Sequence, residues 1–220
     1  KVGADPTGLP FNSVIALELH GGKPLSPLVN AGAIATTSLI NAENVEQRWQ
    51  RILHIQQQLA GEQVALSDEV NQSEQTTNFH NRAIAWLLYS AGYLYCDAME
   101  ACDVYTRQCS TLLNTVELAT LGATLAAGGV NPLTHERVLQ ADNVPYILAE
   151  MMMEGLYGRS GDWAYRVGLP GKSGVGGGIL AVVPGVMGIA AFSPPLDEEG
   201  NSVRGQKMVA SVAKQLGYNV

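Results

Sequence analysis

The sequence has few charged residues, few aromatic residues and no long apolar run. Charged residues make up 15% and aromatic residues 6% of its 220 residues, and 20 acidic against 13 basic side chains give a net charge of −7 at pH 7. This negative balance, without a dense Lys/Arg cluster, argues against a nucleic-acid partner. Polar, glycine and proline residues interrupt every apolar stretch before it reaches the ~20 residues of a membrane span. We therefore expect a soluble, cytoplasmic protein with no membrane partner.

Cysteine is also scarce, and its spacing argues against a metal site. Cys96, Cys102 and Cys109 are odd in number, lie in one predicted helical stretch and match no zinc or redox motif. We expect all three to be reduced and buried, because a free cysteine packs as a small apolar side chain. The sequence predicts no metal ligands.

The first two thirds of the sequence are dominated by helical patterns. Residues 2–10 are rich in turn formers and predict a loop, and helices are expected to begin at Asn30, at Val45 and at Asn78, whose side chain would cap the third. The clearest helix begins at Asn114, which can form a capping box with Glu117. Another helix is expected to begin near residue 142 and to carry three consecutive methionines.

Short β-type runs appear only after residue 161. Residues 179–183 and 186–192 flank Pro184-Gly185 and predict an antiparallel hairpin. The last fifteen or so residues predict an amphipathic helix that covers this sheet; its expected apolar face is Met208, Val209, Val212 and Leu216. A helical block followed by strands and a terminal helix favours an α+β fold over alternating βαβ units, in a single domain over residues 1–220.

The most informative segment is the glycine-rich run 171–178. Gly171-Lys172-Ser173 matches the end of a phosphate loop, but the position where that motif needs an earlier glycine is Arg166, and a β-type run follows instead of a helix. A single glycine would indicate only a bulge or a close strand crossing. Repeated glycines against a strand instead indicate backbone N–H groups that a ligand can approach. This layout is that of the Lys-Thr-Gly element of penicillin-recognising serine enzymes, where backbone N–H groups help to form an oxyanion hole.

Several motifs together resemble those of the serine-dependent glutaminases, the bacterial enzymes in particular, and the resemblance runs from Val2 to near the C-terminus. They are Asn30-Ala31-Gly32-Ala33-Ile34, Ser73-Glu74 with Asn81-Arg82, the run 167–178, and Ser193-Pro194-Pro195-Leu196 with Gly200-Asn201-Ser202. The resemblance implies an amidohydrolase that converts L-glutamine to L-glutamate and ammonia. It also implies a fold similar to serine β-lactamases and DD-peptidases, no metal or organic cofactor, and a homo-oligomer, either a dimer or a tetramer.

The resemblance assigns four residues to glutamine binding. Asn30, Glu74, Asn81 and Tyr105 match the family's positions, and Glu74 would pair with the substrate's α-ammonium group. Taken alone, the two asparagines would more often be helix caps and Tyr105 a core residue. The local pattern places Glu74 in a polar turn before the helix that begins at Asn78.

Two further residues match positions that are both catalytic and substrate-binding. Tyr157 would lie beside the nucleophile and relay its proton, which requires a lowered pKa or a neighbouring cation; otherwise it is a helix-end aromatic residue. The backbone N–H of Val175, expected on a strand, would bind the developing oxyanion. Lys172 would add positive potential for the substrate.

The family's nucleophile and base, a Ser-x-x-Lys pair, are expected upstream of the Asn30 motif, in a segment that this chain lacks. The single Ser-x-x-Lys of the chain, Ser211 to Lys214, falls on the predicted terminal helix, where such a pair is an ordinary surface feature. We therefore expect these residues to be the C-terminal portion of a longer catalytic domain. Two alternatives stay open: a catalytically inactive glutamine-binding or penicillin-binding-like module, and a β-lactamase or peptidase.

Overall fold

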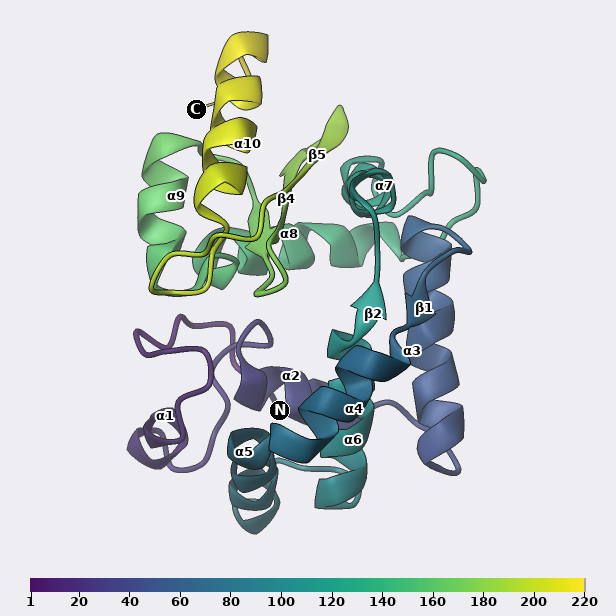
Figure 1. The fold of residues 1–220 in the computed structure, drawn as a ribbon, viewed down its shortest axis with the longest axis vertical. Coiled ribbons are helices and arrows are strands. Elements are labelled where there is room, and N and C mark those ends of the chain that lie inside the picture. Colours follow the sequence, from purple (N-terminus) through teal and green to yellow (C-terminus); the bar gives the residue numbers. More distant parts are fainter. Residues whose placement is uncertain (220) are drawn as a thin grey trace. The chain divides into compact units, whose positions relative to one another are not determined.

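The computed structural model describes residues 1–219 (Figure 1). The chain folds into two compact units. Unit 1 comprises Lys1–Ile55 and Val64–Leu112, and unit 2 comprises Gln56–Gln63 and Leu113–Val220. Each unit has its own buried apolar cluster. The single catalytic domain expected over residues 1–220 stays a prediction.

Unit 1 is helical apart from one short pair of strands. Its elements are α1 (Ile15–Leu19), α2 (Asn30–Ser38), α3 (Val45–Ala60, which ends in the segment assigned to unit 2), β1 (Ala65–Leu66), α4 (Asp68–Thr77), α5 (Phe79–Ser90), α6 (Ala98–Cys109) and β2 (Thr111–Leu112). Helices α2, α5 and α6 surround a core that includes the fully buried Ile34, Ile84 and Leu88. The helix starts predicted at Asn30 and Val45 are confirmed.

The predicted polar turn around Glu74 is wrong, because residues 68–77 form the regular helix α4. Ser67 caps it by accepting a hydrogen bond from the Val70 N–H at 3.3 Å. No residue of α4 is buried, so the helix has no apolar stripe for a sequence pattern to reveal. Asn78 separates α4 from α5, and its side chain does not cap α5 as predicted; it donates to Thr106 Oγ1 at 2.9 Å instead.

The cysteines differ from one another more than the sequence predicts. Cys102 is buried on α6, but Cys96 is partly exposed before that helix begins and Cys109 is exposed at its end. The prediction that all three are buried is therefore wrong for two of them. Burial raises the pKa of Cys102 from its ordinary value of 9.0 to about 11 and also raises the pKa of Cys96.

Unit 2 is built on a three-stranded antiparallel sheet in the order β3-β4-β5. Its elements are α7 (Thr115–Ala126), the 3-10 helix η1 (Ala141–Asn143), α8 (Val144–Glu154), the 3-10 helix η2 (Tyr157–Arg159), α9 (Ser160–Arg166), β3 (Gly171–Ser173), β4 (Gly178–Val183), β5 (Met187–Phe192) and α10 (Val203–Leu216). Strands β4 and β5 form the predicted hairpin, and the capping box between Asn114 and Glu117 is present. Figure 1 shows α9 and α10 close together beside this sheet.

Helices cover both faces of the sheet, so β4 is buried from Ile179 to Val183. Ile179, Ala181 and Val183 pack with residues of α9 and α10, whereas Leu180 and Val182 pack with α7 and α8. This burial on two faces explains why β4 is a continuous apolar run instead of an alternating one. The sheet is a rigid support for the residues at its ends.

The terminal helix α10 covers the sheet as predicted, but with a narrower face. Val209 and Ala213 are fully buried, whereas Met208, Val212 and Leu216 each expose more than a third of their surface. The buried face is completed by Gly205, where an added Cβ would lie 2.8 Å from Ile179 Cγ2. The small residues Gly205 and Ala213 allow α10 to pack close to β4. The buried face of the helix is therefore narrow.

Candidate functional site

Three of the predicted glutamine-binding residues form one hydrogen-bonded network in unit 1. Tyr105 on α6 donates through its hydroxyl to Asn30 Oδ1 at 3.1 Å, and Asn30 Nδ2 on α2 donates to Asn81 Oδ1 on α5 at 2.8 Å. Neither asparagine caps its helix. Asn81 takes part in this network through its oxygen, and its Nδ2 is a further donor group of the side chain. The network fixes three side chains from three helices.

Glu74 is placed on α4 with its side chain exposed. Within residues 1–219 no hydrogen bond links it to the asparagine and tyrosine network. Its helix is nevertheless fastened to α5, because Arg82 Nη2 donates to the Gln75 carbonyl at 2.5 Å, and to α6, because Gln75 Nε2 donates to Asp103 Oδ1 at 2.6 Å. Glu74 and Asn81 lie on different helices, so they do not share a helix face.

Tyr157 has an unusual backbone and a cation beside its ring. Its φ of 55° lies in the left-handed region, which is rare for a non-glycine residue. Lys172 on β3 places its Nζ 3.2 Å from the Tyr157 hydroxyl and 4.4 Å from the ring centroid. Lys172 Nζ also donates to the Ser173 carbonyl. The neighbouring cation that a proton-relaying tyrosine requires is thus present, although fifteen residues separate the two in sequence.

Val175 lies in the turn between β3 and β4 and not on a strand, which corrects the sequence prediction. Gly177 N–H donates to the Gly174 carbonyl at 2.9 Å, and Gly174 N–H donates to the Gly178 carbonyl at 3.0 Å. Gly177 has φ of 99°, as a tight hairpin of this kind requires. In the described part of the chain, no acceptor receives the N–H of Val175. The turn therefore presents a backbone donor at an exposed position.

Close backbone contacts hold this turn and Tyr157 together within unit 2. An added Cβ at Gly155 would lie 1.7 Å from the Gly171 carbonyl oxygen, and the Gly155 carbonyl accepts a hydrogen bond from Ser173 N–H at 3.0 Å. An added Cβ at Gly177 would lie 2.8 Å from the Ser193 carbonyl oxygen. Glycine is required at both positions because no side chain fits. Sequence reasoning did not single out Gly155, which follows a helix in an otherwise ordinary context.

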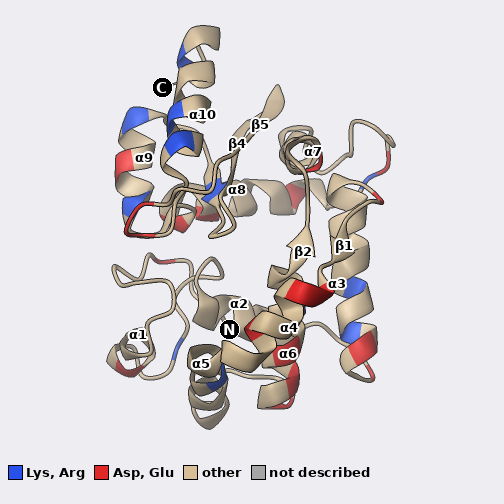
Figure 2. Ribbon diagram, in the orientation of Figure 1, with Lys and Arg blue, Asp and Glu red and all other residues tan. Residues whose placement is uncertain are grey.

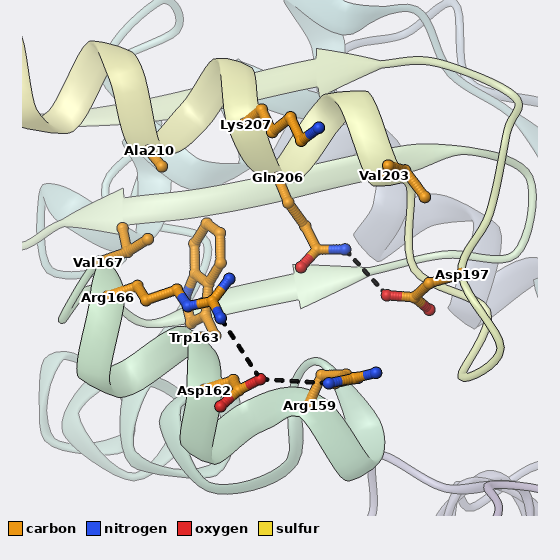
Figure 3. A pocket seen from close by; sticks show the side chains of 10 residues that line it. All are labelled: Arg159, Asp162, Trp163, Arg166, Val167, Asp197, Val203, Gln206, Lys207 and Ala210. Atoms are coloured by element: carbon orange, nitrogen blue, oxygen red, sulfur yellow. Dashed lines mark hydrogen bonds and ion pairs between the residues drawn. The ribbon is translucent and has the colours of Figure 1, made fainter.

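A hollow of about 310 Å³ lies elsewhere in unit 2, between α9 and α10 (Figure 3), and none of the predicted site residues lines it. Asp162 in this hollow pairs with Arg159 at 3.2 Å and with Arg166 at 4.0 Å. Figure 2 shows that basic and acidic residues alternate on α9 and that basic residues lie on α10. These exposed pairs largely neutralise one another and contribute little to stability.

The Ser-x-x-Lys on α10 is a surface feature, as predicted. Ser211 and Lys214 are both exposed, and Ser211 Oγ accepts a hydrogen bond from Gln215 Nε2 at 3.0 Å. Within residues 1–219, no three His, Cys, Asp or Glu side chains are grouped so that they could hold a metal ion, and none of the helices combines the length and the apolar character of a membrane span.

The chain is similar to known glutaminases over its whole length. The glutaminase family model matches residues 1–220. Glutaminase 1 of Escherichia coli K12 is 98% identical over all of this chain, which spans 71% of that protein. A solved structure described as the probable glutaminase ybaS is also 98% identical, with a TM-score of 0.98 over 99% of this chain and 71% of the other.

A more distant relative adds a chemical observation. A crystal structure of the Bacillus subtilis glutaminase YbgJ, 33% identical with a TM-score of 0.86 over 90% of this chain and 70% of that one, is a covalent complex with 5-oxo-L-norleucine. The expected amidohydrolase class and the α+β, serine β-lactamase-like fold are confirmed by these matches. With a family model over every residue and a relative 98% identical, the chain belongs to the glutaminase family, the enzymes that hydrolyse glutamine.

Proposed function

We propose that Asn30, Glu74, Asn81 and Tyr105 bind L-glutamine, and that Tyr157 and the backbone N–H of Val175 act on its side-chain amide. In this proposal the enzyme is a serine-type amidohydrolase. Its nucleophile and base are a Ser-x-x-Lys pair outside the 220 residues. The contact between Lys172 and the Tyr157 hydroxyl at 3.2 Å carries the proposal, because it supplies the cation that the tyrosine's role requires.

Substrate recognition rests on the network of Asn30, Asn81 and Tyr105. The network leaves Asn81 Nδ2 as a donor suited to the α-carboxylate of an amino acid. Glu74, an exposed carboxylate side chain, is suited to the α-ammonium group. A site with one donor for a carboxylate and one anion for an ammonium group selects a free amino acid over a peptide or a β-lactam.

The chemistry is acyl transfer in two steps. The serine hydroxyl attacks the side-chain amide carbonyl, and its proton passes to the base. The carbonyl oxygen, now negative, accepts a hydrogen bond from the N–H of Val175. The amide nitrogen receives a proton by way of Tyr157 and leaves as ammonia, which produces the γ-glutamyl ester. Water then cleaves the ester to L-glutamate and the free serine.

The cation of Lys172 has a defined task in this sequence. It donates to the Tyr157 oxygen, so that oxygen is stabilised each time it gives up its proton. The Bacillus subtilis relative supports the covalent route, since its complex with 5-oxo-L-norleucine is covalent. We further propose that the enzyme works in the cytoplasm as a homo-oligomer without a metal or an organic cofactor.

Replacing Tyr157 with phenylalanine tests the proposed chemistry. We expect kcat for ammonia release from glutamine to fall about 100-fold, because a positioned proton-transfer group contributes about 10²–10⁴-fold, while KM changes less than twofold. The matched control is Tyr165→Phe, which removes a hydroxyl from an 88% exposed tyrosine on α9 and should leave both constants unchanged. A rise in KM with unchanged kcat would show that Tyr157 only binds substrate.

A further inference from the structure

Asn201 is a fully buried polar side chain that joins two segments of unit 2. Its Nδ2 donates to the Leu156 carbonyl at 3.2 Å, and its Oδ1 accepts from Ser173 Oγ at 2.5 Å. Asp197 also holds this residue: its Oδ1 accepts from the Asn201 N–H at 2.9 Å and from Asn201 Nδ2 at 3.3 Å, and its N–H donates to the Asn201 carbonyl at 2.9 Å. Because the Asn201 side chain is fully buried, its hydrogen bonds are costly to lose.

The two residues that Asn201 holds are the neighbours of the proposed catalytic pair. Leu156 directly precedes Tyr157, and Ser173 directly follows Lys172. One side-chain amide thus bridges the backbone that carries the tyrosine and the strand that carries the lysine. Its hydrogen bonds to Leu156 and Ser173 act together with the bond from the Ser173 N–H to the Gly155 carbonyl to hold these segments at the separation that gives the 3.2 Å contact between Lys172 Nζ and the Tyr157 hydroxyl.

The backbone at Tyr157 needs such a restraint. Tyrosine is strained in the left-handed region, so a φ of 55° persists only when the surrounding structure over-determines it. Ser160 Oγ contributes on one side by accepting from the Leu156 N–H at 3.0 Å and donating to the Tyr157 carbonyl at 2.9 Å. Asn201 contributes on the other by holding the Leu156 carbonyl. Two buried side chains thus hold the Leu156 N–H, the Leu156 carbonyl and the Tyr157 carbonyl.

The next residue, Ser202, makes an equivalent connection to the Val175 turn. Its Oγ donates to the Ser193 carbonyl at 2.7 Å, and the Ser193 N–H donates to the Gly177 carbonyl at 2.9 Å. Ser202 also caps α10 by accepting from the Gly205 N–H at 3.1 Å. The motif Gly200-Asn201-Ser202 therefore connects the start of α10 to both parts of the proposed site in unit 2.

We propose that Asn201 is a positioning residue for catalysis, which sets the contact between Tyr157 and Lys172 without touching substrate. This inference rests on the proposed role of Tyr157. It predicts that the loss of the Asn201 amide lowers kcat by impairing the Tyr157–Lys172 pair and leaves the recognition residues of unit 1 unaffected. If Asn201 merely stabilised the fold, its loss would change kcat equally whether or not Tyr157 is present.

A double-mutant cycle in the complete enzyme tests this proposal. Asn201→Ala should lower kcat for glutamine 10- to 100-fold with KM within twofold, in conditions where urea titration shows the variant to be folded. In the Tyr157→Phe background the same change should lower kcat less than twofold, because the group it positions is already absent. An equal loss in both backgrounds would overturn the proposal and leave Asn201 a scaffold residue.

Two further variants make the outcome decisive. Val209→Ala, a change at a buried residue of α10 in the apolar cluster that also contains Leu156, is the control for loss of stability and should leave kcat within twofold.

If Asn201→Ala does not fold, Ser173→Ala is the variant that tests the proposal. It removes the hydrogen bond from Ser173 Oγ to Asn201 Oδ1 and should lower kcat about fivefold, again only when Tyr157 is present. A Ser173→Ala enzyme with unchanged kcat would refute the proposal. An unchanged kcat in Tyr157→Phe alone would refute the proposed function itself, and the positioning role with it.

Discussion

The two units hold their candidate site residues by different means. In unit 1, Asn30, Asn81 and Tyr105 are connected through side-chain hydrogen bonds on regular helices. In unit 2, the important features belong to the backbone: a left-handed tyrosine, the N–H of Val175 in an exposed turn, and glycines where no Cβ fits. Side-chain networks allow specificity to be changed one residue at a time, whereas backbone geometry must be preserved as a whole. Substitutions that disturb this backbone in unit 2 should therefore have larger effects than substitutions that change one side chain in unit 1.

The largest expected effect tests the backbone contacts of unit 2. Gly155→Ala places a Cβ 1.7 Å from the Gly171 carbonyl and 2.3 Å from the Met151 carbonyl, so α8 and β3 must separate. We expect a loss of about 3 kcal/mol in the free energy of unfolding and a fall in kcat of more than about 100-fold. Urea unfolding and steady-state kinetics measure the two effects.

The control for Gly155→Ala is a glycine in the neighbouring helix. Gly161 on α9 has no atom within 4 Å of an added Cβ. Gly161→Ala should leave kcat unchanged and stabilise unit 2 by about 0.5 kcal/mol, since alanine favours a helix over glycine. Equal behaviour of the two variants would show that the contact between α8 and β3 does not position the site.

The intermediate effect tests the side-chain network of unit 1. Asn81→Asp keeps the oxygen that accepts from Asn30 but replaces the Nδ2 donor with a second, negative oxygen. If that donor binds the substrate's carboxylate, its loss costs about 2 kcal/mol, equivalent to a rise in KM of about 30-fold, with kcat within threefold. Steady-state kinetics with glutamine measure this, and Asn41→Asp adds the same charge at an exposed position of unit 1 as a control. A fall in kcat at constant KM would contradict the division between the units.

The smallest effect concerns pH and leaves activity unchanged. Cys102 lies one helical turn before Tyr105 on α6, and burial raises its pKa to about 11. Because the folded state disfavours the thiolate, the contribution of Cys102 to stability is constant below about pH 9 and is lost as the pH rises from 9 toward 11. Urea midpoints measured across this range should fall more steeply for the native protein than for Cys102→Ala. Parallel curves would mean that the thiol is not buried in solution.

Local signals predicted the regular elements of the fold well. The capping box at Asn114 and the turn at Pro184-Gly185 each depend on neighbouring residues, and both are present. The helix that carries Glu74 was missed because it buries no side chain and so has no apolar period. The sequence also placed Val175 on a strand, since it does not show where a hairpin turns within a run of glycines.

The site residues were identified by resemblance, and their interactions came only from the structure. The contact of Lys172 with Tyr157 and the hydrogen bonds of Asn201 join residues that are far apart in sequence. No periodicity or propensity encodes such contacts. The motif Gly200-Asn201-Ser202 was visible in the sequence, but its role could not be derived until its partners were known.

The left-handed conformation of Tyr157 has a consequence for protein engineering. Glycine or asparagine occupies this region of backbone space at lower cost than tyrosine does, so a search for thermostable variants would favour replacing it. The same replacement would remove the phenol that the proposed reaction needs. At this position selection for thermal stability alone would lead away from the active enzyme, and any stabilised library should keep residue 157 fixed.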